Sequence, residues 1–195
     1  LGPSPRRPGG AGLTLLGRSL WRPAAWGVAS PAPYAALSLI GAIDAAARGA
    51  ALALLPFAFA RAGMDAADVG VAFAILFGAG AAGKFLCGPL ASRTGLAVTI
   101  IVTEVVTALG IMVIPLAPRE AILWAILPFG FSLNGTSTVL YSLVAPLAIP
   151  EQRARAYGLY YTITLLATAG SPLLYGAVAD VTDLDTAFGA LGVVT

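Results

Sequence analysis

The sequence predicts an all-α membrane protein whose helices cross the bilayer several times. Of its 195 residues, 58% are hydrophobic and only 10% are charged, and the mean hydropathy is +0.89. A soluble domain usually carries about a quarter charged residues, so this chain has too few to cover a globule in water. Long apolar runs alternate with short polar links, which is the pattern of consecutive spanning helices. These runs predict a six-helix bundle.

Several function classes are excluded by residue types that the chain lacks. It contains no His and a single Cys, Cys87. This excludes a disulfide within the chain, a Cys/His zinc site and a His-based catalytic triad. We therefore expect no metal, no cofactor and no enzymatic activity. The eleven basic residues are scattered along the chain, so no nucleic-acid partner is expected.

The chain divides into a basic leader and a membrane domain. Residues 1–30, rich in Pro, Gly and Arg, are expected to form a cytoplasmic linker, and residues 31–195 to form the transmembrane domain. The expected spans are 34–60, 69–90, 96–116, 121–149, 157–179 and 186–195. A span needs about 20 apolar residues, so the last one is predicted to be incomplete. Since the chain also begins with Leu1 rather than Met, we expect a fragment, with a complete half-size protein as the alternative.

Basic residues are unevenly distributed between the two sets of links. One side carries Arg6, Arg7, Arg18, Arg22, Lys84, Arg93, Arg153 and Arg155, and the other side carries only Arg61 and Arg119. Cytoplasmic links are the ones enriched in Lys and Arg. The distribution predicts a cytoplasmic N-terminus in a multi-pass protein of the plasma (inner) membrane.

Two charged residues fall inside the first span. Asp44 lies about 15 Å into it, at 1.5 Å per residue, and Arg48 follows one turn later on the same face. Each costs at least about 2.5–3.5 kcal/mol at the centre of a spanning helix. Two interpretations follow: a neutralising pair that tolerates burial, or a cavity-lining pair that binds a polar substrate or couples a proton.

Further polar residues lie in later spans. Glu104, about 12 Å into the third span, is either a structural partner of another helix or a second protonatable carboxylate. Asn134 and Tyr141 in the fourth span are seven residues apart and so share a face; Asn134 bonds a neighbouring helix or contacts a substrate. Tyrosines at the start of the fifth span, Tyr157, Tyr160 and Tyr161, favour an interfacial aromatic belt. Lys84 is interpreted as a side chain that reaches the inner surface.

One motif joins the second and third spans. Gly88-Pro89-Leu90-Ala91-Ser92-Arg93-Thr94-Gly95 resembles the G-x-L-A-D-R-x-G loop of the major facilitator superfamily, which lies between the second and third helices of each half. Ser92 stands where the strongest version of that loop has Asp. The resemblance implies a conformational loop at Gly88, Arg93 and Gly95. The run Gly170-Ser171-Pro172 with Gly176 is similar to the glycine/proline motif of the family's fifth helix, which implies helix packing at Gly170, Pro172 and Gly176.

The degenerate motif is typical of the second half of the family's fold. The resemblance therefore implies helices seven to twelve of a twelve-helix transporter. Its partners would be the lipid bilayer and a missing N-terminal six-helix half, or a second copy of the chain as a homodimer. The runs 43–48 and 134–141 are similar to the drug-efflux branch related to fosmidomycin-resistance proteins. In this family the seventh and tenth helices line the central cavity, which favours a substrate- or proton-binding role for Asp44, Arg48, Asn134 and Tyr141.

The function expected from these observations is secondary active transport. We predict proton-coupled efflux of small molecules or drugs, by antiport and alternating access. The alternatives are an importer of small organic solutes and a non-transporting membrane scaffold or regulatory partner.

Overall fold

The computed structural model describes residues 23–195, which form a helical bundle. In this range the only β feature is an isolated bridge between Val28 and Ala148, so the predicted all-α class is confirmed. Five helices are long and apolar enough to cross a membrane. The principal helices are α2 (Pro31–Arg61), α3 (Ala66–Thr94), α4 (Leu96–Val113), α5 (Arg119–Ser142), α7 (Arg153–Val181) and α8 (Leu184–Val194). Short helices are η1 (Pro23–Trp26), η2 (Ile114–Leu116), α6 (Val144–Leu147) and η3 (Pro150–Gln152).

The motif between the second and third spans is helical rather than a loop. The expected span 69–90 extends to Thr94, and α4 begins at Leu96, so Gly95 alone links the two helices. Gly95 has a φ of +94°, which a residue without a Cβ adopts at little cost. The hydroxyls of Thr94 and Thr99 lie 2.9 Å apart across this link. The predicted conformational loop is therefore the last turns of α3 and a one-residue turn.

The expected span 121–149 is interrupted near its end. Helix α5 passes through Pro128 but ends at Ser142, and α6 follows after Leu143. Pro146 lacks the N–H that would bond the carbonyl of Ser142 in a continuous helix, and its ring clashes there. The last helix, α8, has 11 residues and is about 16 Å long at 1.5 Å per residue.

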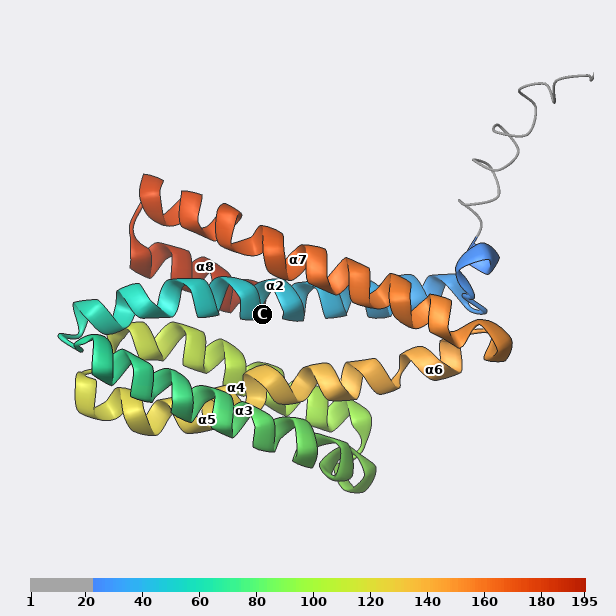
Figure 1. Ribbon diagram of the computed structural model, residues 1–195, viewed down its shortest axis with the longest axis horizontal. Helices are drawn as coiled ribbons and strands as arrows, with labels where there is room; N and C mark the ends of the chain where they lie inside the picture. Colours follow the sequence, from blue (N-terminus) through green and yellow to red (C-terminus); the bar gives the residue numbers. More distant parts are fainter. Residues whose placement is uncertain (1–22) are drawn as a thin grey trace, which may run out of the picture.

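The helices pack in two layers (Figure 1). Helix α2 packs along α7, and α8 contacts both of them as well as α4. The second layer consists of α3, α4 and α5, in which α5 packs against both of its neighbours. Helix α5 also contacts α2 and so joins the layers.

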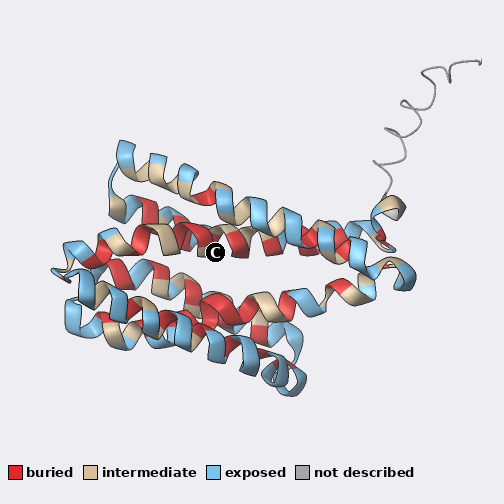
Figure 2. Cartoon of the chain, viewed as in Figure 1, coloured by how far each residue is buried: buried red, intermediate tan, exposed pale blue. Residues whose placement is uncertain are grey.

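The apolar core is continuous at one end of the bundle and divided at the other (Figure 2). The large cluster contains Phe59, Phe129 and Phe188 and draws on α2, α3, α4, α5 and α8. Toward the end where α2 begins, buried residues form two smaller clusters. One joins α2, α6 and α7 around Tyr34 and Tyr160, and the other joins α3 and α5 around Cys87. The space between the layers lies where the core divides.

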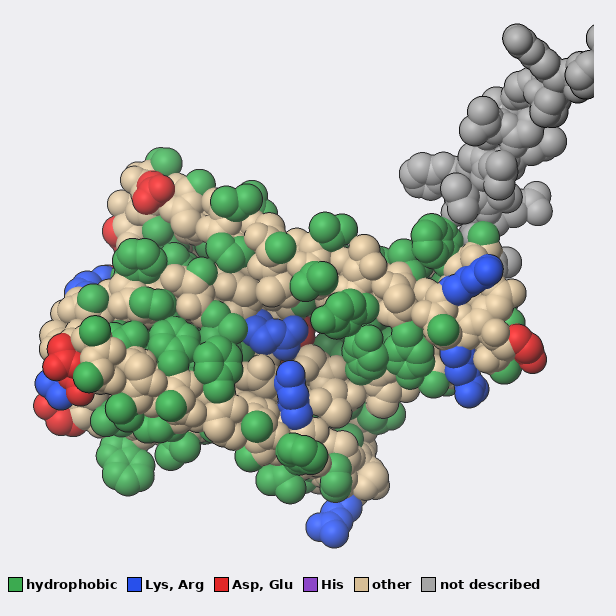
Figure 3. Space-filling model, viewed as in Figure 1, with side chains coloured by type: hydrophobic (Ala, Val, Ile, Leu, Met, Phe, Trp, Pro, Cys, Tyr) green, Lys and Arg blue, Asp and Glu red, His purple; other side chains and the backbone are tan. Residues whose placement is uncertain are grey.

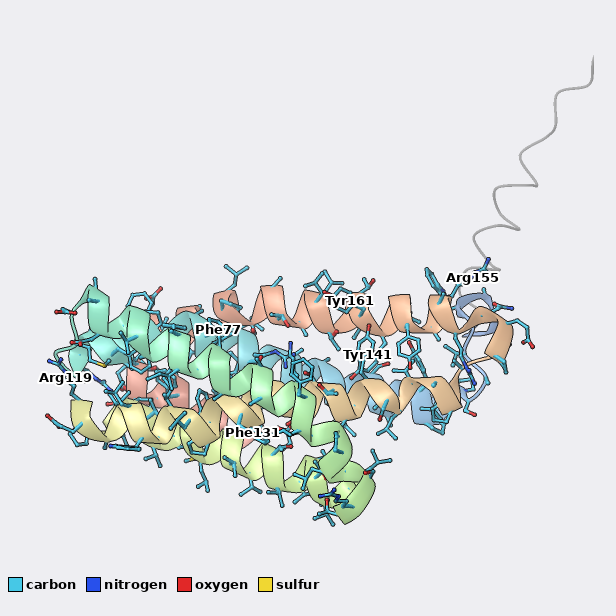
Figure 4. The ribbon with its side chains drawn as sticks, turned by 60° about the horizontal axis from the view of Figure 1, so that its bottom comes forward. Phe77, Arg119, Phe131, Tyr141, Arg155 and Tyr161 are labelled. Atoms are coloured by element: carbon cyan, nitrogen blue, oxygen red, sulfur yellow. The ribbon has the colours of Figure 1, made fainter. Side chains whose placement is uncertain are left out.

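Polar contacts fix the two ends of the bundle. At one end, Asp65 caps α3 by accepting a 2.9 Å hydrogen bond from the Asp68 N–H, and Arg119 pairs with Asp68 at 2.8 Å. Arg61 of α2 pairs with Asp185 of α8. Figure 4 shows Arg119 at this end and Arg155 at the other.

The described part of the predicted linker is packed against the bundle. Residues 1–22 of the expected 1–30 linker lie outside the described residues. Beyond them, Val28 is buried, the Ala29 N–H donates to the carbonyl of Leu147 at 2.9 Å, and the Ile149 N–H donates to the carbonyl of Gly27 at 2.8 Å. Residues 23–30 therefore belong structurally to the bundle.

Glycines allow α3 and α5 to approach closely. A Cβ added at Gly83 would collide with the backbone carbonyl of Phe131, and one at Gly80 would lie 2.5 Å from Asn134 Nδ2. In lipid, where water does not drive helices together, such small residues permit the close packing that holds them. Gly78 on the same helix has open space around it.

We predict that Gly83→Ala destabilises the protein whereas Gly78→Ala does not. The added methyl at Gly83 must push α5 away, and overpacking of this kind costs about 1–3 kcal/mol. Thermal unfolding in detergent should show a lower midpoint for Gly83→Ala and a midpoint equal to or above that of the parent for Gly78→Ala. Equal midpoints for the two variants would contradict this account of the α3–α5 interface.

Candidate functional site

A cavity of about 560 Å³, lined by charged, hydroxyl-bearing and aromatic side chains, lies between the layers where the core divides. Helices α2, α3, α5 and α7 supply its walls. Its lining residues are Gly41, Asp44, Arg48, Lys84, Ser137, Thr138, Tyr141, Ser142, Tyr157, Tyr160, Tyr161, Thr164, Leu165 and Thr168. Figure 3 shows Lys and Arg side chains near the middle of this face, flanked by hydrophobic ones. A site of this size accommodates a small organic molecule.

The predicted pair on α2 is present and lies in the cavity wall. Arg48 Nη2 is 3.4 Å from Asp44 Oδ2, and the side chains are 18% and 6% exposed. Arg48 Nη1 also donates to the carbonyl of Leu133 on α5 at 3.3 Å. The arginine therefore neutralises Asp44 and ties α2 to α5, while its partial exposure leaves it accessible from the cavity.

Glu104 approaches the pair from another helix. It lies on α4 and does not line the cavity. Its carboxyl group is close enough to Asp44 and Arg48 for electrostatic interaction with both. The Oε1 atom is buried without a hydrogen-bond partner among the described residues. Two carboxyl groups and one guanidinium thus meet at mid-depth in the bundle, an arrangement that can hold one additional proton.

The tyrosines of α7 line the cavity instead of forming only an interfacial belt. Tyr141 packs against Tyr157 and Tyr160, with ring centroids 5.1 and 5.6 Å apart, and Figure 4 shows Tyr141 between α5 and α7. Tyr160 is buried because Gly41 leaves room for it; a Cβ at Gly41 would collide with its hydroxyl. The sequence analysis did not predict this part of the cavity wall. The spacing of the tyrosines shows that they share one face of a helix, but it does not show what that face contacts.

Lys84 is a further cavity residue that sequence reasoning missed. We assigned it to the inner surface, yet α3 continues to Thr94, so Lys84 lies about 15 Å before the helix end at 1.5 Å per residue. Its side chain lines the cavity. Among residues 23–195, no carboxylate lies within ion-pair distance of it. The Gly88-Pro89 pair placed the expected helix end too early, and so placed Lys84 too near the membrane surface.

Asn134 does not share the site of Tyr141. Its amide donates to the carbonyl of Gly130 in its own helix at 3.3 Å, and its side chain fills the space over Gly80 of α3. It is therefore an interface residue between α3 and α5. The two residues were expected to share one face of the helix. That face contacts α3 at Asn134 and lines the cavity at Tyr141.

The two motif sets lie away from the cavity. None of Gly88, Arg93, Gly95, Gly170, Pro172 and Gly176 is among its lining residues. A Cβ added at Gly170 or Gly176 would meet no atom within 4 Å in the described part of the chain, so close packing at these glycines is not observed there. The close contact between α2 and α7 is made at Gly49, where a Cβ would lie 2.7 Å from Ser171 Oγ.

Comparison with known proteins gives one match. The family described as Major Facilitator Superfamily matches residues 37–195. No curated protein and no solved structure matches the chain. The matched range covers the five long spanning helices almost completely, and the cavity lies entirely within it. On this evidence the chain belongs to the major facilitator superfamily and is a membrane transporter.

Proposed function

We propose that the protein is a secondary active transporter that exports small molecules or drugs in exchange for protons, by alternating access. The observation that supports this most directly is the Asp44–Arg48 ion pair in the wall of the cavity. Ionisable groups at membrane depth are costly, and in transport proteins they mark substrate and ion pathways. The cavity provides space for a substrate, and the carboxyl groups provide a place for a proton.

A second six-helix unit completes the cavity in this proposal. Three charged and several hydroxyl-bearing side chains line the cavity, which opens on one face of the bundle, and lipid can cover charged side chains only at a large cost. A preceding half of the same polypeptide, or a second copy of this chain, would enclose it. The chain described here then corresponds to helices seven to twelve, in or near the drug-efflux branch that the sequence resembles.

Alternating access would be rocking of the two units about the enclosed substrate. The helix end at Gly88, Arg93 and Gly95 lies at the side that we assign to the cytoplasm, together with Arg153 and Arg155. In the orientation that we propose, the N-terminus is cytoplasmic and the protein lies in the plasma (inner) membrane.

Proton coupling is assigned to Asp44 and Glu104. Both carboxyl groups interact with Arg48, so protonation of either one changes how strongly the guanidinium is held. A less tightly held Arg48 is free to contact a substrate from the cavity wall. Tyr141 would contribute a contact to the substrate body.

We predict that Asp44→Asn abolishes proton-driven flux while the protein still inserts into the membrane. The amide keeps the size of the side chain but can neither bind a proton nor neutralise Arg48. Flux of labelled drugs and organic anions should be measured for the full-length protein in vesicles with an imposed proton gradient.

The matched control for this variant is Asp65→Asn at the cap of α3, where an amide oxygen still caps the helix and flux should be unchanged. Parental flux in Asp44→Asn, or parental flux that a protonophore does not alter, would contradict the coupling role. Absence of flux for every compound would favour a scaffold, and gradient-driven uptake would favour an importer.

We predict that Glu104→Gln impairs proton coupling but leaves substrate movement intact. Glu104 does not line the cavity, so exchange of labelled for unlabelled substrate without a gradient should persist. Gradient-driven accumulation should fall by about tenfold or more, the loss expected when a coupling free energy of about 1–3 kcal/mol is removed. Glu120→Gln in the first turn of α5 serves as the control. If both kinds of flux survive in Glu104→Gln, Glu104 is only a structural partner of Asp44.

A further inference from the structure

We propose that the cavity selects organic anions that carry an aromatic or other flat apolar body. This inference rests on the proposed transport function and names the substrate class of the same cavity. The observations behind it are the balance of charges on the cavity wall, the position of Lys84 and the cluster of tyrosines.

The charged side chains that line the wall sum to one positive charge; Glu104 interacts with Asp44 and Arg48 from behind the wall and does not line it. Asp44, Arg48 and Lys84 are the charged residues that line the cavity. Asp44 is 6% exposed and is paired with Arg48 at 3.4 Å, so its charge is compensated and largely covered. Lys84 has no carboxylate partner among residues 23–195, so its ammonium group is the uncompensated charge that a ligand meets.

The position of Lys84 makes this charge effective. Its side chain is exposed at the open side of the cavity. Once the second unit of the proposed transporter encloses the cavity, screening by water and ions is weaker there than at a free surface. An ammonium in such a position binds an anionic oxygen by charge-assisted hydrogen bonds and repels a cation. Arg48 on the facing helix keeps part of its surface open to the same space, which adds a second donor group.

The remainder of the wall suits a flat apolar body. Tyr141, Tyr157 and Tyr160 form a contiguous aromatic surface, and Tyr161 and Leu165 extend it along α7. Aromatic faces also attract cations, so the tyrosines alone would fit a cationic drug. The uncompensated Lys84 and the covered Asp44 decide between the two classes in favour of an anion.

Three probes with the same ring system and different charge test this inference: 2-naphthoate, 2-naphthamide and 2-naphthylmethylammonium. Their binding to the purified full-length protein should be measured by calorimetry, independently of transport. We expect 2-naphthoate to bind at least about tenfold more tightly than the other two, from the strength of a charge-assisted hydrogen bond. Equal binding, tighter binding of the ammonium, or no binding of any probe would overturn the proposal.

Variants of Lys84 identify the group responsible. Lys84→Gln should remove the preference for 2-naphthoate, Lys84→Arg should retain it, and Lys84→Glu should favour 2-naphthylmethylammonium. Arg93→Gln removes the same charge from an exposed position on the same helix outside the cavity, and it should leave the preference intact. A preference that persists in Lys84→Gln, or that Arg93→Gln abolishes equally, would contradict the assignment.

Failure of this inference differs from failure of the proposed function. If the full-length protein binds 2-naphthoate selectively but moves none of the compounds across vesicles, transport is contradicted and the anion site stands. If it transports the ammonium or amide probe in preference to the carboxylate, transport stands and the anion site is contradicted.

Discussion

The Asp44–Arg48 ion pair is the constraint on which the arrangement around the cavity depends. Neither charge can face lipid at mid-membrane without a large cost, so the helices around the pair must cover it with protein or with an aqueous space. Two glycines of α2 allow α7 to pack closely around the pair. Gly49 lets the backbones of α2 and α7 approach each other, and Gly41 leaves space for the ring of Tyr160. Arg48 in turn holds α5 through the carbonyl of Leu133. The cavity is the space that remains after the pair has been partly enclosed.

Features that depend on local sequence could be predicted. The apolar runs predicted the helices, and the i, i+4 spacing predicted the Asp44–Arg48 pair. Features that depend on which side of a helix meets which neighbour could not be predicted. The spanning helices are apolar around most of their circumference, so periodicity does not distinguish a lipid face from a cavity face. Lys84, Tyr157 and Tyr160 were therefore placed at the membrane surface instead of in the cavity wall.

At the end of α3, residues that favour a turn form a helix instead. Glycine and proline at Gly88 and Pro89 favour a break in a soluble protein, yet the helix continues to Thr94. Near the bilayer, an open turn leaves backbone groups without partners, whereas a helix satisfies them internally. Neighbouring hydroxyls assist: Thr94 and Ser92 donate to carbonyls of the preceding turn. The chain reverses only at Gly95, where a positive φ is needed.

An anion site would also determine which force drives the proposed exchange. Moving one elementary charge across a membrane is worth about 2.3 kcal/mol per 100 mV. A neutral substrate leaving as one proton enters carries one charge across, whereas an anion leaving as one proton enters carries the equivalent of two in the same direction. With the cytoplasm negative, about 4.6 kcal/mol per 100 mV then favours export, even without a pH difference. The uncompensated charge of Lys84 would thus determine the substrate class and make the membrane potential a major driving force.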